Sequence, residues 1–466
     1  MADHDLSPLT AVSPIDGRYA GKTAALRGYF SEHALIRYRV RVEVAYLRAL
    51  YGLGLPQLGG DYDEAFERLE LRVAGFSESD SACVKEIERT TNHDVKAVEY
   101  WLKEQAEAVG LGAIKEFVHF GLTSQDINNT AIPLSLREAI EEVVAPALSD
   151  VHADLRGLAR EWSEVPMLAR THGQPASPTR LGKEIAVFVQ RLETLLFELA
   201  LLDHPAKFGG ATGNFNAHLV AYPEVDWVSF ADEFVTSLGL THSYPTTQIE
   251  HYDGLAAICH HFSRVATVLI DLCQDVWQYV SMEYFRQRTV AGEVGSSAMP
   301  HKVNPIDFEN AEGNLGVARA LFGHLAAKLP VSRQQRDLTD STVLRNLGVP
   351  FAHVLIATQS IRKGLGKLEL NREALAAALE ENWMVVAEGI QTILRREGYP
   401  QPYEALKALT RGHAQVGERE IAAFIDGLDV DNAIKRELRA VRPETYTGVS
   451  YDVDGTAEED GGGGVD

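Results

Sequence analysis

Apolar residues recur every three or four positions over long stretches of this chain, which is the spacing of an amphipathic α-helix. The clearest runs are Leu136, Ile140, Val143, Ala147, Val151, Leu155 and Leu158; Ile185, Phe188, Leu192, Leu195, Leu199 and Leu202; and, between Thr247 and about Ser281, Ile258, Phe262, Val265, Leu269, Leu272 and Val276. They predict helices of about 25–35 residues, well above the usual mean of roughly 11–12. Because the alternating pattern of strands is scarce, we expect an all-α fold whose long helices form a bundle shared between subunits.

The predicted helices divide the chain into three sections. Residues 1–115 hold shorter helices and an irregular N-terminal arm, and residues 116–365 hold the long helices. Residues 366–451 return to short segments, broken by Gly398-Tyr399-Pro400 and by Gly427. The last stretch, 452–466, is acidic and rich in glycine. Such a composition cannot bury a useful apolar face, so we expect a disordered tail.

Composition limits the classes of partner. The 466 residues include 66 acidic and 44 basic side chains, for a net charge of −22. This argues against a nucleic acid or an anionic membrane as partner, because no net positive field would hold their phosphates. An anionic small molecule would need a local basic cluster that outweighs the surrounding field. A salt-rich cytoplasm would also explain the acidic excess.

Cysteine usage and the N-terminus indicate a cytoplasmic protein. Cys83, Cys259 and Cys273 are far apart and form no CxxC pair, which is typical of reduced thiols. Cys259-His260-His261 lies inside an apolar run, where a core cysteine beside two helix histidines is favoured over a metal cluster. No basic region precedes an apolar core at the N-terminus, so no signal peptide is expected. No uninterrupted apolar stretch reaches the roughly 18 residues needed to span a bilayer.

The segment with the most specific chemistry is Gly295–Pro305, which has the sequence GSSAMPHKVNP. Small residues let the backbone approach an anionic ligand, Lys302 supplies positive charge, and Pro305 has the fixed φ that suits the opening of a helix. A serine held among N–H donors near a lysine can act as a base. The alternative is an ordinary loop with an exposed lysine.

Two further segments lie where helices are expected to break. Thr171–Ala176 (THGQPA) places His172 beside a glycine in an exposed loop between two long helices, and imidazole can donate or accept a proton near neutral pH. In His119–Asp126 (HFGLTSQD), Thr123 and Ser124 stand where a helix would be capped. The same hydroxyls and helix N-terminal amides can receive a carboxylate or a phosphate, so the two interpretations are compatible.

Together these three segments resemble the signature segments of the fumarase/aspartase superfamily, whose members eliminate fumarate from succinyl-type substrates. The resemblance implies a three-domain all-α fold with a central long-helix bundle shared in a homotetramer. It also implies that each active site takes its three signature segments from three different subunits.

Three more stretches indicate the branch of the superfamily. Thr90–Val95 (TTNHDV), Ser13–Tyr19 (SPIDGRY) and Arg336–Arg345 (RDLTDSTVLR) resemble segments of the adenylosuccinate lyases, especially their bacterial branch. The likeness runs from about Leu9 to the mid-440s. Argininosuccinate lyases and aspartases or fumarases are the rivals within the superfamily, and a non-catalytic helical scaffold is the rival outside it.

The resemblance implies β-elimination of fumarate from adenylosuccinate and from the succinyl-carboxamide ribotide of purine synthesis. By the family pattern Ser296 is the base, His172 the acid, and Glu309 the carboxylate that orients the histidine. Lys302 and Asn304 would bind the succinyl carboxylate and the developing carbanion, with Ser297 beside them. No metal or organic cofactor is implied, because the reaction moves protons and no electrons.

The resemblance also divides the binding residues into two groups. Those expected to hold phosphate and ribose are Arg18, Tyr19, Arg336, Ser341 and Arg345, with His119 as a further candidate. Those expected to line the succinyl and base end are Thr91, Asn92, His93, Thr123, Ser124 and Gln248. Taken singly, the arginines are equally compatible with solvated surface charges, and Asp337 and Asp340 with turn and capping residues.

Overall fold

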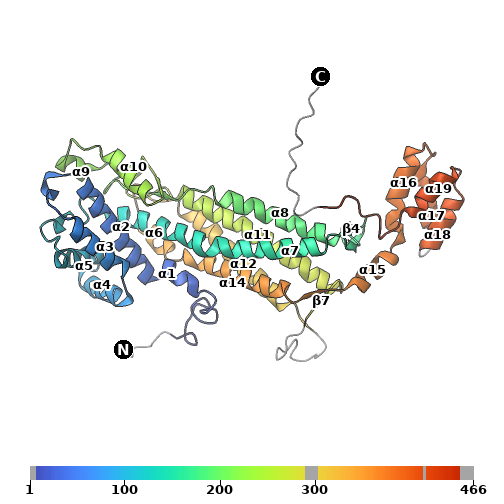
Figure 1. Ribbon diagram of the computed structural model, residues 1–466, viewed down its shortest axis with the longest axis horizontal. Coiled ribbons are helices and arrows are strands. Elements are labelled where there is room, and N and C mark those ends of the chain that lie inside the picture. Colours follow the sequence, from blue (N-terminus) through green and yellow to red (C-terminus); the bar gives the residue numbers. More distant parts are fainter. Residues whose placement is uncertain (1–6, 289–302, 413–415, 452–466) are drawn as a thin grey trace, which may run out of the picture. The chain divides into compact units, whose positions relative to one another are not determined.

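A computed structural model describes residues 7–288, 303–412 and 416–451, and helices dominate it (Figure 1). The strands it describes are two or three residues long and pair only two by two. The predicted all-α class is therefore confirmed. The tail predicted for 452–466 lies outside the described residues, and the division into three sections stays a prediction.

Two compact units make up the chain. The first comprises the residues up to Leu148, Leu195–Ile270 and Ala311–Gln359, and the second comprises Ser149–Thr194, Asp271–Asn310 and the residues from Ser360 onward. The boundaries fall inside long helices, namely α7 (Ala145–Glu161), α8 (Leu181–Leu199), α11 (Asp253–Ser281), α12 (Ile306–Lys328) and α14 (Gly348–Leu365). We describe each unit separately.

Nine α-helices lie wholly within the described part of the first unit. These are α1 (Arg27–Phe30), α2 (Glu32–Gly52), α3 (Asp63–Ala74), α4 (Glu78–Thr91), α5 (Asp94–Ala108), α6 (Ser124–Ala139), α9 (Asn216–Ala221), α10 (Trp227–Ser237) and α13 (Thr339–Leu344). Single turns η1 (Ala24–Leu26), η2 (Pro56–Leu58) and η3 (Lys115–Phe117) connect them, and β5 (Pro205–Ala206) pairs in parallel with β6 (Thr241–His242).

The second unit adds short antiparallel strand pairs and a cluster of C-terminal helices. β1 (Pro166–Met167) pairs with β4 (Thr179–Arg180), β2 (Arg170–Thr171) with β3 (Gln174–Pro175), and β7 (Phe285–Gln287) with β8 (Leu368–Leu370), all antiparallel. The helices are α15 (Arg372–Glu380), η5 (Trp383–Val386), α16 (Ala387–Arg396), α17 (Pro402–Gly412), α18 (Glu418–Asp426) and α19 (Asn432–Ala440). A separate apolar cluster centred on Trp383, Ile390 and Ile425 holds the last helices together.

The predicted long helices form, with differences at their ends. α6 continues through the π-turn η4 (Ile140–Val144) into α7, so the first predicted run is helical throughout. α8 has 19 residues, so the length of about 25–35 predicted for the second run is wrong, and the helix ends at Leu199, three residues before the last position of that run. α11 is 29 residues long but begins at Asp253, not at Thr247. Just before it, the N–H of Glu250 donates to the Asn129 side chain (3.0 Å) and Tyr252 has a φ of +62°, so this segment cannot be helical.

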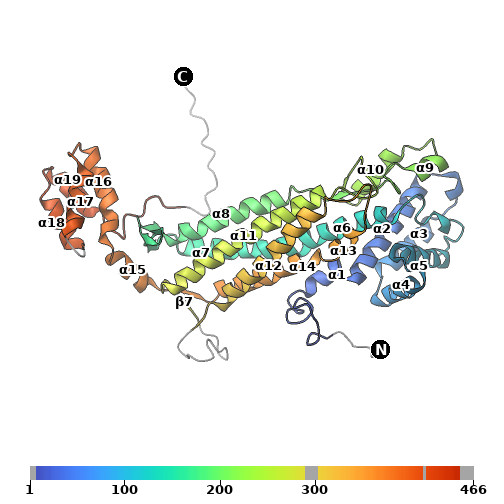
Figure 2. The ribbon, with the colours of Figure 1, turned by 180° about the vertical axis from the view of Figure 1, so that it is seen from behind.

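The core of the long helices in the first unit is aromatic. Phe262 of α11, Phe322 of α12 and Phe351 of α14 contact one another with ring centroids 4.8–5.6 Å apart, and all three are fully buried. The three helices lie side by side in both views (Figures 1 and 2). Among the described residues, α11 is the one helix long and apolar enough to cross a membrane by length and composition, and 61% of its apolar window is buried inside the structure. A core helix passes the same test.

Candidate active site

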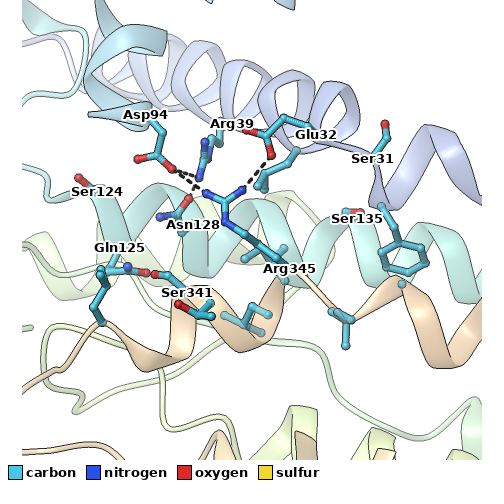
Figure 3. A pocket seen from close by; sticks show the side chains of 18 of the residues that line it. Ser31, Glu32, Arg39, Asp94, Ser124, Gln125, Asn128, Ser135, Ser341 and Arg345 are labelled. Atoms are coloured by element: carbon cyan, nitrogen blue, oxygen red, sulfur yellow. Dashed lines mark hydrogen bonds and ion pairs between the residues drawn. The ribbon is translucent and has the colours of Figure 1, made fainter. Parts of the chain in front are cut away.

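A cavity of about 600 Å³ opens in the first unit between α2, the junction of α4 and α5, the start of α6, and the segment around α13 (Figure 3). The predicted site residues that line it are Asn92, His93, Ser124, Arg336, Ser341 and Arg345. They come from three of the stretches singled out in the sequence, which are separated by about 30 and 210 positions along the chain. The fold therefore brings predicted binding residues together in one cavity.

The junction of α4 and α5 forms one wall of the cavity. Asn92 ends α4 with a φ of +51°, a left-handed conformation that asparagine tolerates better than most residues. His93 then caps α5, because its Nδ1 accepts from the N–H of Lys96 (3.1 Å). With Nδ1 as an acceptor the ring can donate only through Nε2, which lies 3.4 Å from Oγ of Ser124. Thr91 does not line the cavity, and its hydroxyl donates to the carbonyl of His93 (3.3 Å).

The N-terminus of α6 faces the same wall. Thr123 is its N-cap, as predicted, and the N–H of Thr123 donates to Oδ2 of Asp126 (2.7 Å). Asp126 is fully buried and pairs with the equally buried Lys207 (2.7 Å). Ser124 and Gln125 line the cavity directly above this anchor, whereas Thr123 does not. The capping and the binding interpretations of this segment are thus compatible, as expected.

The segment around α13 forms the opposite wall. Arg336 donates through Nη2 to Oγ of Ser341 (3.0 Å) and through Nη1 to Oε1 of Gln248 (3.4 Å). Gln248 does not line the cavity, and its link to the cavity wall is this hydrogen bond with Arg336. Asp337 is a turn residue whose Oδ1 accepts from the N–H of Thr339 (2.8 Å). The hydrogen bonds from Thr339 lower the pKa of Asp337 to about 2.

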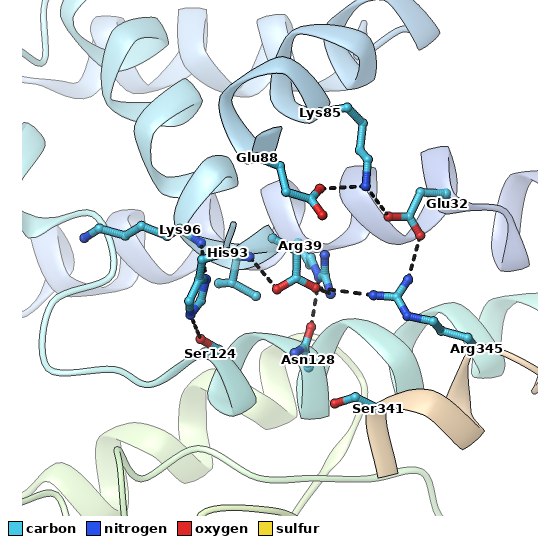
Figure 4. A network of polar contacts seen from close by, with 12 residues as sticks. Glu32, Arg39, Lys85, Glu88, His93, Lys96, Ser124, Asn128, Ser341 and Arg345 are labelled. Carbon is cyan, nitrogen blue, oxygen red and sulfur yellow. Dashed lines mark hydrogen bonds and ion pairs between the residues drawn. The ribbon is translucent and has the colours of Figure 1, made fainter. Parts of the chain in front are cut away.

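Two guanidinium groups share one carboxylate in the cavity. Arg39 on α2 donates to Oδ2 of Asp94 (2.6 Å), and Nη2 of Arg345 lies 3.6 Å from the same oxygen (Figure 4). Nε of Arg39 also donates to Oδ1 of Asn128 (2.8 Å). Burial opposes ionisation of Asp94, but the charge and hydrogen bond of Arg39, the N–H of Val95 and the charge of Arg345 together outweigh it and lower the pKa of this carboxyl. Arg345 has a second partner, because its Nη1 donates to Glu32 (2.9 Å).

Three residues predicted for the phosphate side do not line this cavity: Arg18, Tyr19 and His119. Arg18 is exposed on the N-terminal arm, where the N–H of Gly17 bonds to Ser13 and that of Tyr19 to Pro14 (3.0 and 2.9 Å). His119 has its Nδ1 2.6 Å from Oε1 of Glu43, a carboxylate with no exposed surface.

The histidine of this pair is held in a charged environment. Burial disfavours the charge on His119, yet the charge and hydrogen bond of Glu43, together with the charges of Glu99 and Asp126, outweigh burial and raise the pKa of the imidazole. The positive φ of His119, +62°, turns the chain just ahead of the α6 cap.

The predicted catalytic residues that the structure describes, His172 and Glu309, belong to the second unit. His172 and Gly173, with φ values of +53° and +73°, form the two-residue turn of the β2–β3 hairpin, and His172 is exposed there. Two positive φ angles are typical of the hairpin turn that matches strand twist. The segment is thus a break between α7 and α8, as predicted, although it forms a hairpin rather than an irregular loop.

The remaining catalytic candidates surround the start of α12. Pro305 precedes α12, as predicted, and its carbonyl accepts from the N–H groups of Phe308 and Glu309 (3.1 and 3.2 Å). Glu309 is exposed in the first turn and accepts from Nε1 of Trp277 (3.1 Å), and Asn304 is half-buried just before the helix. Ser296, Ser297 and Lys302 lie outside the described residues.

Comparison with known proteins agrees with the sequence resemblance. The chain matches the family described as Lyase over residues 17–320 and the family described as Adenylosuccinate lyase C-terminal over residues 332–447. It is 55% identical to the adenylosuccinate lyase of Dictyostelium discoideum, over 96% of this chain and 98% of that protein. It is 52% identical to the adenylosuccinate lyase of Escherichia coli (strain K12), over 95% of this chain and 98% of that protein. The chain belongs to the adenylosuccinate lyase family.

Two solved structures resemble the fold of this family member. A fumarate lyase from Mesorhizobium sp. BNC1 superposes with a TM-score of 0.72 at 19% identity, and a 3-carboxy-cis,cis-muconate lactonizing enzyme from Pseudomonas putida with a TM-score of 0.70 at 22%. Each match covers 91% of this chain and 94% of the other. At these identities the likeness shows the fold alone, which is the predicted fumarase/aspartase-like fold.

Several residues of the cavity were not predicted from the sequence of this adenylosuccinate lyase family member. Arg39 holds Asp94 and itself donates to Asn128, and Glu32 and Glu88 add carboxylates to the lining. The spacing of charges on α2 could have pointed to Arg39. It lies four residues before Glu43, and both are buried charges within a run that otherwise buries apolar residues. Buried charges need partners, so such a pair on one helix face marks a polar site.

Proposed function

We propose that this chain catalyses β-elimination of fumarate from adenylosuccinate, giving AMP, and from the succinyl-carboxamide ribotide of purine synthesis. The full-length likeness to proteins named adenylosuccinate lyase supports this proposal. The structural observation that carries it is the cavity in which Arg336, Ser341 and Arg345 face the His93–Ser124 wall. A protein with a net charge of −22 needs such a local cluster to bind a substrate that carries one phosphate and two carboxylates.

In the proposed mechanism the two proton transfers belong to two different side chains. Ser296, as the alkoxide, removes the proton from the carbon beside a carboxylate of the succinyl group. The electron pair forms the double bond of fumarate as the carbon–nitrogen bond breaks, and His172 donates a proton to the departing nitrogen. Lys302 and Asn304 stabilise the charge that develops on the carboxylate between these steps. Glu309 orients His172.

We propose that the working enzyme is a homotetramer in which His172 and Ser296 of each site come from different subunits. The long helices support an assembly, because they expose large apolar side chains. Phe197 at the end of α8 is 68% exposed, Val317 on α12 46%, and Trp277 on α11 43%. Apolar surface of this kind on long helices is what a shared helical core would cover.

The assay that tests the reaction follows fumarate release by ultraviolet absorbance. Purified full-length protein is given adenylosuccinate, argininosuccinate, aspartate or malate in separate reactions. We expect turnover of adenylosuccinate alone; silence on this substrate would refute the proposed function. His172→Ala and Ser296→Ala should each lower turnover by about 10²–10⁴-fold while AMP still binds, because each removes one proton-transfer group.

Subunit mixing tests the shared site. Equal amounts of the inactive His172→Ala and Ser296→Ala proteins are dissociated, mixed and reassembled. If the two residues of a site come from different chains, about a quarter of the sites receive both intact residues, by the combinatorics of a closed symmetric oligomer. No recovery from properly reassembled tetramers would place both residues on one chain.

A further inference from the structure

His172 lies at the tip of a narrow hairpin in the second unit. The strand pairs β2–β3 and β1–β4 follow one another along this hairpin, and between them the N–H of Ala176 donates to the carbonyl of Ala169 (2.9 Å). Pro175 and the buried Pro178 each fix a φ angle in the returning strand, which stiffens it. A stiff hairpin turns as one piece, so the contacts at its base set the direction of His172.

The first contact at this base joins the hairpin to α16. Oγ of Ser177, which lies between β3 and β4, donates to Oε2 of Glu388. The same carboxylate oxygen accepts from the hydroxyl of Tyr446 (3.1 Å). Gly389, buried on α16, leaves room for the tyrosine ring, because a Cβ at this position would lie 3.0 Å from Cε2 of Tyr446. One carboxylate therefore links the hairpin, the first turn of α16 and the segment that follows α19.

The second contact ties the last strand of the hairpin to the segment that follows α19. Nη1 of Arg180 in β4 donates to the carbonyls of Gly448 and Thr447 (2.9 and 3.3 Å). The Arg180 side chain is 17% exposed, and its Nε lies 3.6 Å from Oε2 of Glu164. Ser450 donates to the other oxygen of Glu164 (2.9 Å). The segment after α19 thus bonds both to Arg180 and to the carboxylate that pairs with it.

We propose that Glu388 and Arg180 are positioning residues that hold His172 in the direction from which it donates its proton. The inference rests on the proposed function, in which His172 is the acid. Ser177, the residue that Glu388 holds, is five positions from His172, and five residues of extended chain span up to about 16 Å. At that distance a tilt of about 4° at the base displaces the imidazole by about 1 Å, and a misplacement of this size can lower turnover about 10²-fold.

The experiment measures steady-state release of fumarate from adenylosuccinate by full-length variants. Ser177→Ala removes one hydrogen bond and should lower kcat about three- to tenfold, whereas Arg180→Met removes both carbonyl contacts and should lower it about 10²-fold. KM should stay within about twofold of the wild type, because neither side chain lines the cavity of the first unit. Glu388→Gln keeps an oxygen that can accept from Ser177 and should retain most of the turnover, and Glu388→Ala should behave like Ser177→Ala. Ser229→Ala is the matched control, since it removes a serine-to-carboxylate hydrogen bond (2.8 Å, to Asp226) in the first unit and should leave kcat unchanged.

A double variant separates positioning from a general loss of structure. When His172→Ala has removed the acid, adding Ser177→Ala should leave the residual turnover within about twofold of His172→Ala alone. A further fall by the factor seen in the wild-type background would overturn the inference, because Ser177 and Glu388 would then act through another group.

The single variants give two further results that would overturn it. One is an unchanged kcat in Ser177→Ala, which decides the matter by itself if Arg180→Met does not fold. The other is a rise in KM with kcat unchanged, which would make these residues part of substrate binding. If His172→Ala keeps the turnover of the wild type, or if the wild type does not release fumarate, the proposed function fails instead.

Discussion

Lys207 and Asp126 form an ion pair in which neither side chain has any exposed surface, and this pair anchors the start of α6 beneath the cavity. Nζ of Lys207 lies 2.7 Å from Oδ1 of Asp126 and 2.6 Å from the carbonyl of Gly210. Lys207→Met would preserve much of the side-chain volume and remove the charge and both hydrogen bonds. The carboxylate of Asp126 and the Gly210 carbonyl would then be buried without this partner.

The loss of stability expected for Lys207→Met depends on the hydrogen bonds that Asp126 keeps. Removing one member of a buried ion pair costs about 3–5 kcal/mol. Asp126 keeps hydrogen bonds from the backbone N–H groups of Thr123, Gly209 and Gly210, at 2.7–3.2 Å. These bonds still stabilise the charge, so we expect a loss at the lower end of the range, about 3 kcal/mol. For a large domain each kcal/mol lowers the thermal midpoint by about 2 °C, which predicts a drop of roughly 6 °C.

Differential scanning calorimetry of the full-length protein measures this drop. Lys115→Met is the matched control, since Lys115 pairs with Glu107 at a similar distance (2.6 Å) but with 33% and 64% of the two side chains exposed. An exposed pair contributes about 0–1 kcal/mol, so the control should lose no more than about 2 °C. Equal shifts in the two variants would refute the reasoning that burial makes the Lys207 pair costly to break.

Three further predictions concern the polar groups of the first unit and the cysteines. Because Glu43 raises the pKa of His119 against the effect of burial, His119 should stay charged at a pH above its usual pKa, and substrate affinity that depends on this charge should fall as the pH rises through the raised pKa. Glu43→Gln should move this fall to lower pH. Identical pH profiles of KM in the variant and the wild type would contradict the role of the pair. Arg39→Met should raise KM at least about tenfold with little change in kcat, because Asp94 loses its buried partner in the wall of the substrate-binding cavity. An equal loss in kcat, measured by steady-state kinetics, would contradict this. In native protein a thiol reagent should modify the exposed Cys83 and spare Cys259, since burial raises the pKa of that thiol to about 12; mass spectrometry of labelled peptides would reveal any other order.

The sequence by itself determined the helical class, the long helices and the family. Apolar periodicity is a local property of the chain, so the register of α7 and α11 could be predicted without knowledge of their neighbours. The segment around His172 was likewise predicted to break two helices, because its glycine and proline act on the local backbone. The motif segments identified the family because they are contiguous in the chain.

Only the tertiary structure decided which of these segments meet and what supports them. Arg39 reaches Asp94 and Asn128, which lie 55 and 89 residues away, and α11 starts late because Glu250 bonds to Asn129, 121 residues before it. Gln248, predicted for the succinyl and base end, is not among the residues that line the cavity and accepts a hydrogen bond from Arg336, which does line it. Such partners are chosen by packing between distant elements, because a buried charge or amide bonds to whichever group the fold places within about 3 Å, and periodicity along one helix carries no information about that group.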